Sequence, residues 1–418
     1  MTTRREFLRT ATAAAATAAM PIPLVHAAGS DVLRVGLIGC GGRGTGAAEQ
    51  ALKADPNVKL VAMGDAFENR IKSSLANLRQ AVGEKVDVKE DQCFVGFDAY
   101  KHVIAASDVV LLCEPPHFRP SHLKAAIEAG KHVFAEKPVA VDGPGVRSVL
   151  ATCEEARKKG LSIVSGLCLR YSAGFREMMK RLHDGAIGDL VALQANDYRG
   201  GRWARSREDG WSDMTWHMRN WYNFTWLSGD FNVEQHVHYL DVCAWAMKDQ
   251  YPVKAVGMGG RSVLTGPEYG NIYDHFSIVY EYANGTKLFS NTRQHPKCKG
   301  DMSAWAMGSK GRALISEGPL TISGENAWEH KGKDKNMYQV EHDEFFASIR
   351  SGKPINNGEY MSKSSLLAIM GRMAAYTGQQ ITWEQALNSK EDLTPAKYEW
   401  DLAIATPPVA IPGVTKFF

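Results

Sequence analysis

The stretch VLRVGLIGCGGRG, residues 32–44, decides the fold of the N-terminal half of the chain. Residues 32–38 are apolar and rich in β-branched side chains, which predicts a short buried strand. The glycines that follow fit the spacing G-x-G-x-x-G, and we expect a helix over 45–54. Such glycines permit a tight turn and let the backbone approach a pyrophosphate at the helix N-terminus. The stretch therefore predicts a dinucleotide site that includes Gly39, Gly41, Gly42, Arg43 and Gly44.

An acidic residue follows at the distance that this motif requires. A second strand is expected over 58–63, and Asp65 comes directly after it, about 20 residues beyond the last glycine. A carboxylate there binds the adenosine ribose hydroxyls and repels a 2′-phosphate, so NAD is favoured over NADP. Two alternatives stay open. Asp65 could cap a helix that begins near Glu68, and Arg43 or Arg70 could accept the phosphate of NADP.

Two more strands and a helix continue the alternation. Strands are expected over 108–113 and 132–135, with a helix over 121–129 between them. Alternating strands and helices predict a parallel, doubly wound α/β sheet. Ligands of such sheets bind at the carboxyl ends of the strands, where EPPH (114–117) and EKP (136–138) fall.

The first 29 residues have the features of an export signal. Arg4 and Arg5 precede an alanine-rich run over 11–20, and residues 25–27 form an A-x-A-like cleavage site. We interpret residues 1–29 as a twin-arginine signal, which predicts a periplasmic protein and the twin-arginine machinery as a partner. The alternatives are an alanine-rich helix or a transit peptide. Because this route moves folded proteins, we also expect a tightly bound cofactor.

Composition excludes several classes of protein. The 418 residues carry a formal net charge of +3, and no dense basic run suggests nucleic-acid binding. After residue 30, no apolar stretch reaches the roughly 20 residues that span a bilayer, so no stable membrane anchor is expected. The seven cysteines form no CxxC pair and no regular framework, which argues against a zinc ribbon or a disulfide scaffold.

Three motifs together resemble the glucose–fructose oxidoreductase and inositol dehydrogenase family. They are GCGGRG (39–44), EAGKHVFAEKP (128–138) and EQHVHYLD (234–241), and the resemblance runs from about residue 33 to at least 383. It implies a Rossmann domain, taken as 31–163. It also implies a substrate-binding and oligomerisation α/β domain, taken as 164–418, with a large, mostly antiparallel sheet. One face of that sheet is expected to form a homodimer or homotetramer.

The resemblance also implies catalytic roles. Lys137 would point at the reacting carbon and stabilise the alkoxide-like oxygen. His238 would be the general base, with Glu234 beside it where many relatives have Asp. The i, i+4 spacing puts Glu234 and His238 on one helical face if both are helical. Asp241 completes the motif and is assigned to the substrate. Glu136, which precedes the lysine, is assigned to the cofactor.

Further site residues follow from the same resemblance. Pro115 and His117 are assigned to the cofactor, although relatives often carry Thr-Pro-Asn where this chain has Glu114-Pro115-Pro116, and Arg119 stands where a histidine would fall. Arg170 is assigned to the cofactor and Tyr171 to the substrate. His236 is either a substrate ligand or a packed residue. His236, His238 and Glu234 could be taken for a metal cluster. We expect no metal there, because no further ligand stands at the spacing of a metal motif.

Residues 199–226 are unusually rich in tryptophan and arginine, which suits a sugar or a subunit interface. Asn220, Trp221 and Tyr222 lie closest in sequence to the 234–241 motif and are the substrate candidates. The later sequence predicts strands and helices, and an extended tail from 406. The strands are over 188–198, 253–258, 275–282, 287–292 and 313–316, and the helices over 341–351 and 363–377.

The sequence as a whole predicts an NAD(P)-dependent oxidoreductase that acts on CH–OH groups of a sugar, glycoside or polyol. One alternative is a redox-neutral sugar oxidoreductase, or a glycoside 3-oxidation and elimination enzyme, with permanently bound NAD. Another is a non-catalytic sugar-binding or sensing protein on the same scaffold. The lysine, acid and histidine argue against the last, since a binding protein needs no base.

Overall fold

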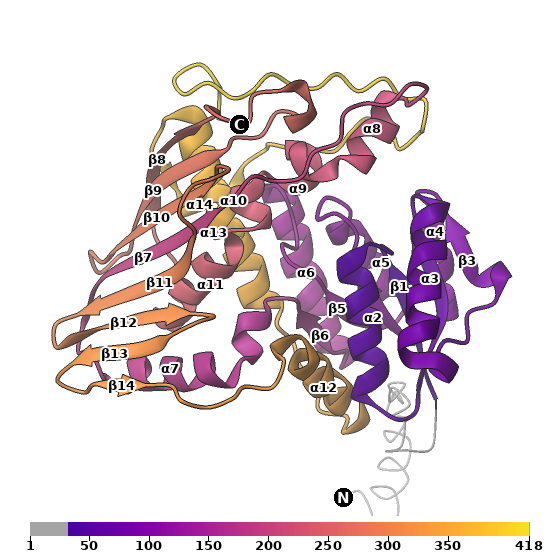
Figure 1. Ribbon diagram of the computed structural model, residues 1–418, viewed down its shortest axis with the longest axis horizontal. Coiled ribbons are helices and arrows are strands. Elements are labelled where there is room, and N and C mark those ends of the chain that lie inside the picture. The colour runs from indigo at the N-terminus through magenta and orange to yellow at the C-terminus, as the bar shows by residue number, and fades with distance from the viewer. Residues whose placement is uncertain (1–31, 418) are drawn as a thin grey trace, which may run out of the picture.

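The computed structural model describes residues 32–417, so the predicted export signal lies outside the described residues. The N-terminal domain is a sheet of six parallel strands in the order β3-β2-β1-β4-β5-β6 (Figure 1). This is the predicted doubly wound parallel sheet. Its strands are β1 (Leu33–Ile38), β2 (Val58–Asp65), β3 (Cys93–Val95), β4 (Val109–Leu112), β5 (His132–Ala135) and β6 (Ile163–Ser165).

Helices cover both faces of this sheet, which explains why its central strands are continuous apolar runs. All four residues of β4 are buried. The covering helices are α2 (Gly42–Ala54), α3 (Glu68–Val82), α4 (Ala99–Ala106), α5 (Arg119–Glu128) and α6 (Gly143–Lys159).

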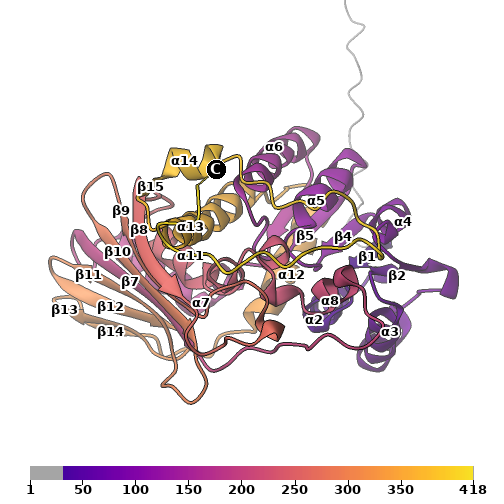
Figure 2. The ribbon, with the colours of Figure 1, turned by 90° about the horizontal axis from the view of Figure 1, so that it is seen from above.

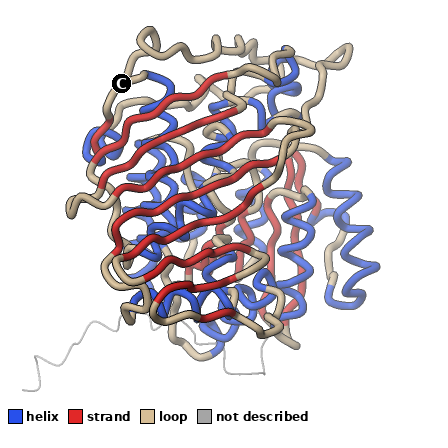
Figure 3. Tube along the Cα trace, turned by 60° about the vertical axis from the view of Figure 1, so that its left-hand side comes forward, coloured by secondary structure: helices blue, strands red, loops and turns tan. Residues whose placement is uncertain are grey.

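The second domain is built on a sheet of nine strands, in the order β14-β13-β12-β11-β7-β10-β9-β8-β15 (Figure 3). Its pairings are antiparallel except that β7 and β10 run parallel, as the sequence predicted for a mostly antiparallel sheet. The strands are β7 (Leu190–Arg199), β8 (Lys254–Gly260), β9 (His275–Glu281), β10 (Lys287–Gln294), β11 (Asp301–Gly308), β12 (Gly311–Ser316), β13 (Leu320–Gly324), β14 (Trp328–Glu329) and β15 (Ile381–Thr382).

The two faces of the nine-stranded sheet differ. Burial alternates along β10, so one face packs inward. The outer face exposes large apolar side chains, among them Val256, Met258 and Phe289.

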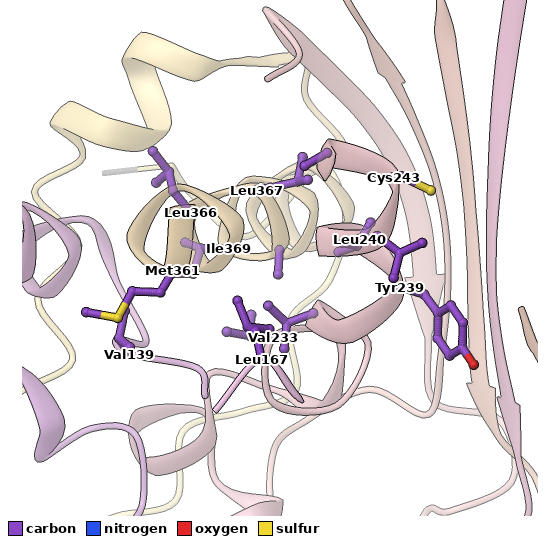
Figure 4. Packing of buried hydrophobic residues seen from close by; sticks show 14 of the residues in the cluster. Val139, Leu167, Val233, Tyr239, Leu240, Cys243, Met361, Leu366, Leu367 and Ile369 are labelled. Atoms are coloured by element: carbon purple, nitrogen blue, oxygen red, sulfur yellow. The ribbon is translucent and has the colours of Figure 1, made fainter. Parts of the chain in front are cut away.

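Three helices fill the space between the two sheets: α10 (Phe231–Glu234), α11 (Val237–Ala246) and α13 (Gly358–Thr377). Figure 4 shows Leu240 of α11 beside Ile369 and Leu367 of α13. The same core cluster contains residues of the Rossmann strands and of the large sheet. The two domains therefore share one hydrophobic core.

The chain returns to the Rossmann domain after the large sheet. Helix α12 (Met337–Arg350) packs on α2, and Arg350 forms an ion pair with Asp55 at 2.8 Å. Ile163 of β6 donates its N–H to the carbonyl oxygen of Ile355. Residues 337–357 thus contact the N-terminal sheet, although they lie far along the chain.

A segment that we call the C-terminal strap, residues 390–412, follows α14 (Trp383–Asn388) and crosses the top of the molecule (Figures 1 and 2). From 402 to 411 it contains no helix or strand. It contacts both domains in turn: the Trp400 ring lies 4.5 Å from that of Phe97, and the carbonyl oxygen of Ala410 accepts from the Tyr273 hydroxyl.

Two further observations concern the described residues. No helix among them is long and apolar enough to cross a bilayer. All seven cysteines are free, and four of them are buried.

Candidate active site

The glycine-rich turn after β1 leaves the N-terminus of α2 open. Gly39 has a φ of 89°, and a side chain there would strike the backbone of Cys113 and Glu114. A Cβ at Gly44 would strike the Gly39 carbonyl oxygen. At Gly41 and Gly42, by contrast, an added Cβ would meet nothing within 4 Å. The tight turn and the open helix end are what a pyrophosphate requires.

A cavity of about 400 Å³ extends from this turn along the carboxyl ends of β1, β2 and β4. Asp65 lines it, with one carboxylate oxygen accepting from Cys40 N at 2.7 Å and the other from Phe67 N at 2.9 Å. Burial raises the pKa of Asp65, against the effect of these N–H donors. Pro115 also lines the cavity, as do Gly39, Gly41, Gly42, Arg43 and Gly44.

Glu114 is a buried acid in this cavity with no hydrogen-bond partner on either carboxylate oxygen. Nδ1 of the His122 ring lies 3.4 Å from one of these oxygens. Buried polar groups of native proteins normally have partners. An unpartnered carboxylate at the end of β4 fits a ligand rich in hydroxyls, as the riboses of a dinucleotide are. The cavity, its open glycines and this acid together fit NAD(P).

The next strand end carries the predicted lysine. Lys137 follows β5, and its Nζ donates to Glu234 Oε1 at 2.9 Å and to the Glu234 carbonyl oxygen at 2.6 Å. Both side chains are almost buried, with 13% and 12% of their surface exposed. Since β5 pairs with β4, Lys137 lies beside the strand end that lines the cavity. The cation is fixed where a reacting oxygen can approach it.

His238, near the start of α11, completes the group. Burial, with Lys137 and Arg199 nearby, lowers the pKa of His238 well below its ordinary value. Its Nδ1 has no hydrogen-bond partner. A neutral imidazole with free acceptor capacity can take a proton.

Glu234 and His238 lie on two separate helices, so the condition for a shared i, i+4 face is not met. Helix α10 ends at Glu234 and α11 begins at Val237. In a continuous helix the Glu234 carbonyl would accept from His238 N, but Lys137 Nζ occupies it instead.

The N-terminal residues match a known family over one continuous range. Residues 33–165 match the oxidoreductase family with an NAD-binding Rossmann fold, Gfo/Idh/MocA. The N-terminal domain of the chain thus matches the NAD-binding domain of this oxidoreductase family.

Individual relatives of this chain are distant. It is 24% identical over 178 residues to 2,7-anhydro-N-acetylneuraminate hydratase of Escherichia coli (strain K12), which is 43% of this chain and 43% of that protein. The match thus spans less than half of that relative. It is 23% identical over 332 residues to inositol 2-dehydrogenase of Serratia proteamaculans (strain 568), which is 77% of this chain and 87% of that protein.

A solved structure shares the whole fold. The aldose-aldose oxidoreductase from Caulobacter crescentus, complexed with glycerol, has a TM-score of 0.66 at 16% identity. The match covers 84% of this chain and all of that one (100%). The Rossmann domain followed by a large sheet is therefore the family's architecture.

Several other predicted site residues are engaged in structural contacts. Arg170 binds Asp241 through two hydrogen bonds of 2.8 and 2.9 Å, and its guanidinium lies 4.0 Å from the Tyr360 ring. The Tyr171 hydroxyl donates to Asn357 Oδ1 at 2.9 Å. None of Arg170, Tyr171 and Asp241 lines the cofactor cavity.

His236 and Asn220 are also buried away from the cavity. His236 shares a hydrogen bond of 2.8 Å with Ser290 of β10, and burial lowers its pKa to about 3. The structure thus places it as a packed residue, one of the two readings of the sequence. Asn220 binds Arg205 N and the Glu268 carbonyl oxygen. Trp221, in contrast, lines the cavity.

His117, Glu136 and Arg43 complete the account of the predicted residues. His117 Nε2 lies 2.7 Å from the Tyr398 hydroxyl of the strap, and burial lowers its pKa to about 4. Glu136 forms an ion pair with Arg43 Nε at 2.8 Å. Arg43 is therefore held by a carboxylate while it lines the cavity.

Sequence reasoning missed two groups of site residues. Arg205 and Arg219 line the cavity with Arg70, and Arg219 lies 4.0 Å from the Phe67 ring. Arg205 and Arg219 belong to the tryptophan- and arginine-rich stretch. Its helix α8 (Asp213–Arg219) therefore borders the cofactor cavity and does not serve a sugar site alone. The ion pair of Asp197 and Arg199, at the end of β7, lies beside Lys137 and Glu234. The sequence feature that could have revealed this ion pair is the run of polar residues at the end of β7.

Proposed function

We propose that this protein is an NAD-dependent dehydrogenase that interconverts a CH–OH group and a carbonyl in a sugar, glycoside or polyol. The observation that carries the proposal is the contact of Lys137 with Glu234, next to the neutral His238 and beside the cofactor cavity. The names of the relatives, an inositol dehydrogenase and an aldose-aldose oxidoreductase, support this substrate class.

The cofactor would be held by the glycine turn at its pyrophosphate and by Asp65 and Glu114 at its ribose hydroxyls. When bound, nicotinamide supplies the acceptor or donor of the hydride. The protein's own groups manage the proton and the charge. His238 takes the proton of the substrate hydroxyl, and the Lys137 ammonium stabilises the oxygen as it becomes anionic. In the reverse direction His238 returns the proton.

Glu234 and the residues of β7 position these groups. Glu234 fixes the lysine through both its side chain and its carbonyl oxygen. Asp197 and Arg199 keep the surroundings of His238 charged and ordered. A lysine held at two points keeps its direction without solvent reorganisation, which is how preorganised charge accelerates a reaction.

The experiment that tests the function begins with the nicotinamide content of the purified protein, measured by absorbance and mass spectrometry. A panel of inositols, aldoses and glycosides is then screened for NADH formation at 340 nm. Turnover of one of them, lost in Lys137→Ala, is expected. Retained nicotinamide with substrate conversion but no net NADH would instead identify the redox-neutral alternative. Sugar binding with no conversion in any assay would identify a sensor and overturn the proposal.

We also propose that the cofactor is tightly held and that the protein is exported by the twin-arginine route. The strap supports the first point, because its aromatic side chains pack on Phe67 and Phe97, which line the cavity. The second rests on Arg4, Arg5 and the residues that follow them in the sequence.

The oligomer is proposed to form through the outer face of the nine-stranded sheet. Met258 and Val256 expose 70% and 47% of their surface there, and apolar patches of this kind mark interfaces. Light scattering after size exclusion should give a dimer or tetramer that Met258→Lys weakens. A monomeric wild type would contradict the proposal.

A further inference from the structure

Two histidines and an aspartate converge at one end of the large sheet, in the second domain. Asp274 precedes β9, His275 is its first residue, and His295 directly follows β10. These strands are antiparallel neighbours in which Arg293 lies opposite His275, so the pairing brings His295 back to the start of β9. The three side chains belong to neither the cofactor cavity nor the group around Lys137.

The ring nitrogens of both histidines face the same carboxylate oxygen. His275 Nδ1 lies 2.7 Å from Asp274 Oδ1, and His295 Nε2 lies 3.2 Å from it. A tetrahedral zinc ion bound at about 2 Å from each ligand separates its ligand atoms by roughly 3.3 Å. The two separations from the carboxylate oxygen are near this value, and all three ligand atoms lie within 4.8 Å of one another, so an ion can enter the cluster after side-chain shifts.

The aspartate is fixed in position by the backbone. Its second oxygen, Oδ2, accepts from Ser262 N, Val263 N and Leu264 N at 3.0, 2.8 and 2.9 Å. Oδ1 is therefore left for the histidines. The backbone thus holds the carboxylate in one fixed orientation, as a preorganised metal ligand requires.

The cluster is open to solvent on the histidine side. The side chains of His275 and His295 are 39% and 17% exposed, whereas that of Asp274 is fully buried. Arg261, the nearest cation on the adjacent loop, directs its donors to the carbonyl oxygens of Leu264, Gly266 and Gly270. An ion can therefore reach the ring nitrogens without opening the core.

We propose that Asp274, His275 and His295 bind one zinc ion or a similar transition-metal ion, with water completing its coordination. Two imidazole nitrogens and one carboxylate oxygen are the donor set of such ions, whereas Mg²⁺ and Ca²⁺ prefer oxygen alone. The ion fastens the loop 261–272, held by Asp274, to the end of β10. Sequence spacing could not reveal this site, because its ligands meet only through strand pairing.

The test is zinc binding by the purified full chain, first stripped with a chelator and then titrated against a chromophoric chelator. Wild type is expected to retain about one zinc per chain after desalting. His275→Ala and His295→Ala should each bind at least about tenfold more weakly. The matched control is His330→Ala, since His330 forms a similar pair with Asp334, 2.9 Å apart, outside this cluster.

Equal binding by His295→Ala and wild type, or equal loss in His330→Ala, would overturn the proposal. So would a wild type that retains no zinc, which would leave the cluster held by hydrogen bonds alone. Because both histidines are partly exposed, their variants should fold. Far-UV circular dichroism of each apo variant checks this, and Asp274→Asn offers a third ligand change if one histidine variant fails. Zinc should also raise the Tm of wild type but not of His275→Ala.

Discussion

The ammonium of Lys137 lies 2.9 Å from a carboxylate oxygen of Glu234, and it also donates to the carbonyl oxygen of that same residue. The lysine follows a strand of the Rossmann sheet, whereas the glutamate ends a helix of the second domain. The cation next to the cofactor cavity is thus held across the boundary between the two domains. Each domain supplies half of the reactive group.

Replacing Lys137 by Ala should lower kcat about 10²- to 10³-fold, because it removes the charge that stabilises the anionic oxygen. Nicotinamide content should stay at the wild-type level, since the lysine does not line the cavity. Steady-state kinetics and cofactor analysis of the same preparation measure both. Lys124→Ala, on the exposed surface of α5, is the control. A K137A protein with wild-type kcat would refute the mechanism.

The pH profile of kcat reports on His238. The base works only when neutral, and burial beside Lys137 and Arg199 holds its pKa well below 6.5. Activity should therefore stay constant from pH 8 to below 6.5 and fall only in more acidic buffer as the imidazole gains a proton. His238→Asn should lose about 10²- to 10⁴-fold in kcat and this acidic limb with it. An acidic limb centred at or above 6.5 would be incompatible with the buried neutral ring.

Asp65→Ser should reduce the preference for NAD over NADP by at least about tenfold, because it removes the carboxylate that repels the 2′-phosphate. Arg70 and Arg219 line the same cavity and can then bind that phosphate. Dissociation constants for both cofactors, measured by quenching of tryptophan fluorescence, give the ratio. Asp87→Ser is the control, because the ion pair of Asp87 with Lys59 is exposed. Asp55→Ser is unsuitable, because Asp55 forms a mostly buried ion pair with Arg350.

Trp400→Ala should speed release of bound nicotinamide at least about tenfold. The ring packs 4.5 Å from Phe97 and 5.3 Å from Phe67, and both of those residues line the cavity. Without it the strap no longer presses on them. Release is measured by dilution into excess labelled NAD. Val414→Ala, an exposed residue beyond the strap, is the matched control. If both variants release nicotinamide at the wild-type rate, the strap does not retain it.

Changing Arg4 and Arg5 together to Lys should abolish export, because the receptor of the twin-arginine route reads this pair. Fractionation of cells that express the full chain should find wild type in the periplasm and the double variant in the cytoplasm. Changing Arg9 to Lys, outside the pair, should leave export intact. Equal distribution of all three proteins would show that residues 1–29 act otherwise.

The Rossmann half could be predicted from sequence because its signals are local. A strand buried on both faces is a continuous apolar run, and Gly39 and Gly44 are required by one turn. Strands β11 and β13 were not predicted. Their burial depends on neighbours far along the chain, as when Asp301–Gly308 pairs with β7. Such pairing leaves only a weak local pattern.

The site was predictable in part for the same reason. Lys137 and Asp65 lie at strand ends, where any parallel sheet collects its ligands. The chain between Glu234 and His238 is not one continuous helix, and the Glu234 carbonyl oxygen accepts from Lys137, 97 residues away. The i, i+4 spacing of two residues carries no information about hydrogen bonds to residues far along the chain. The arginines of α8 likewise reach the nucleotide end only through tertiary packing.

The strap is synthesised after the rest of the cofactor site, because it lies near the end of the chain. Every strand and helix that shapes the cavity lies before residue 390, so all of them leave the ribosome earlier than Trp400 does. Until Trp400 emerges, a nucleotide can enter a pocket whose lining residues are all present but on which the strap does not yet pack. Cofactor binding is therefore easiest during synthesis, before the strap docks.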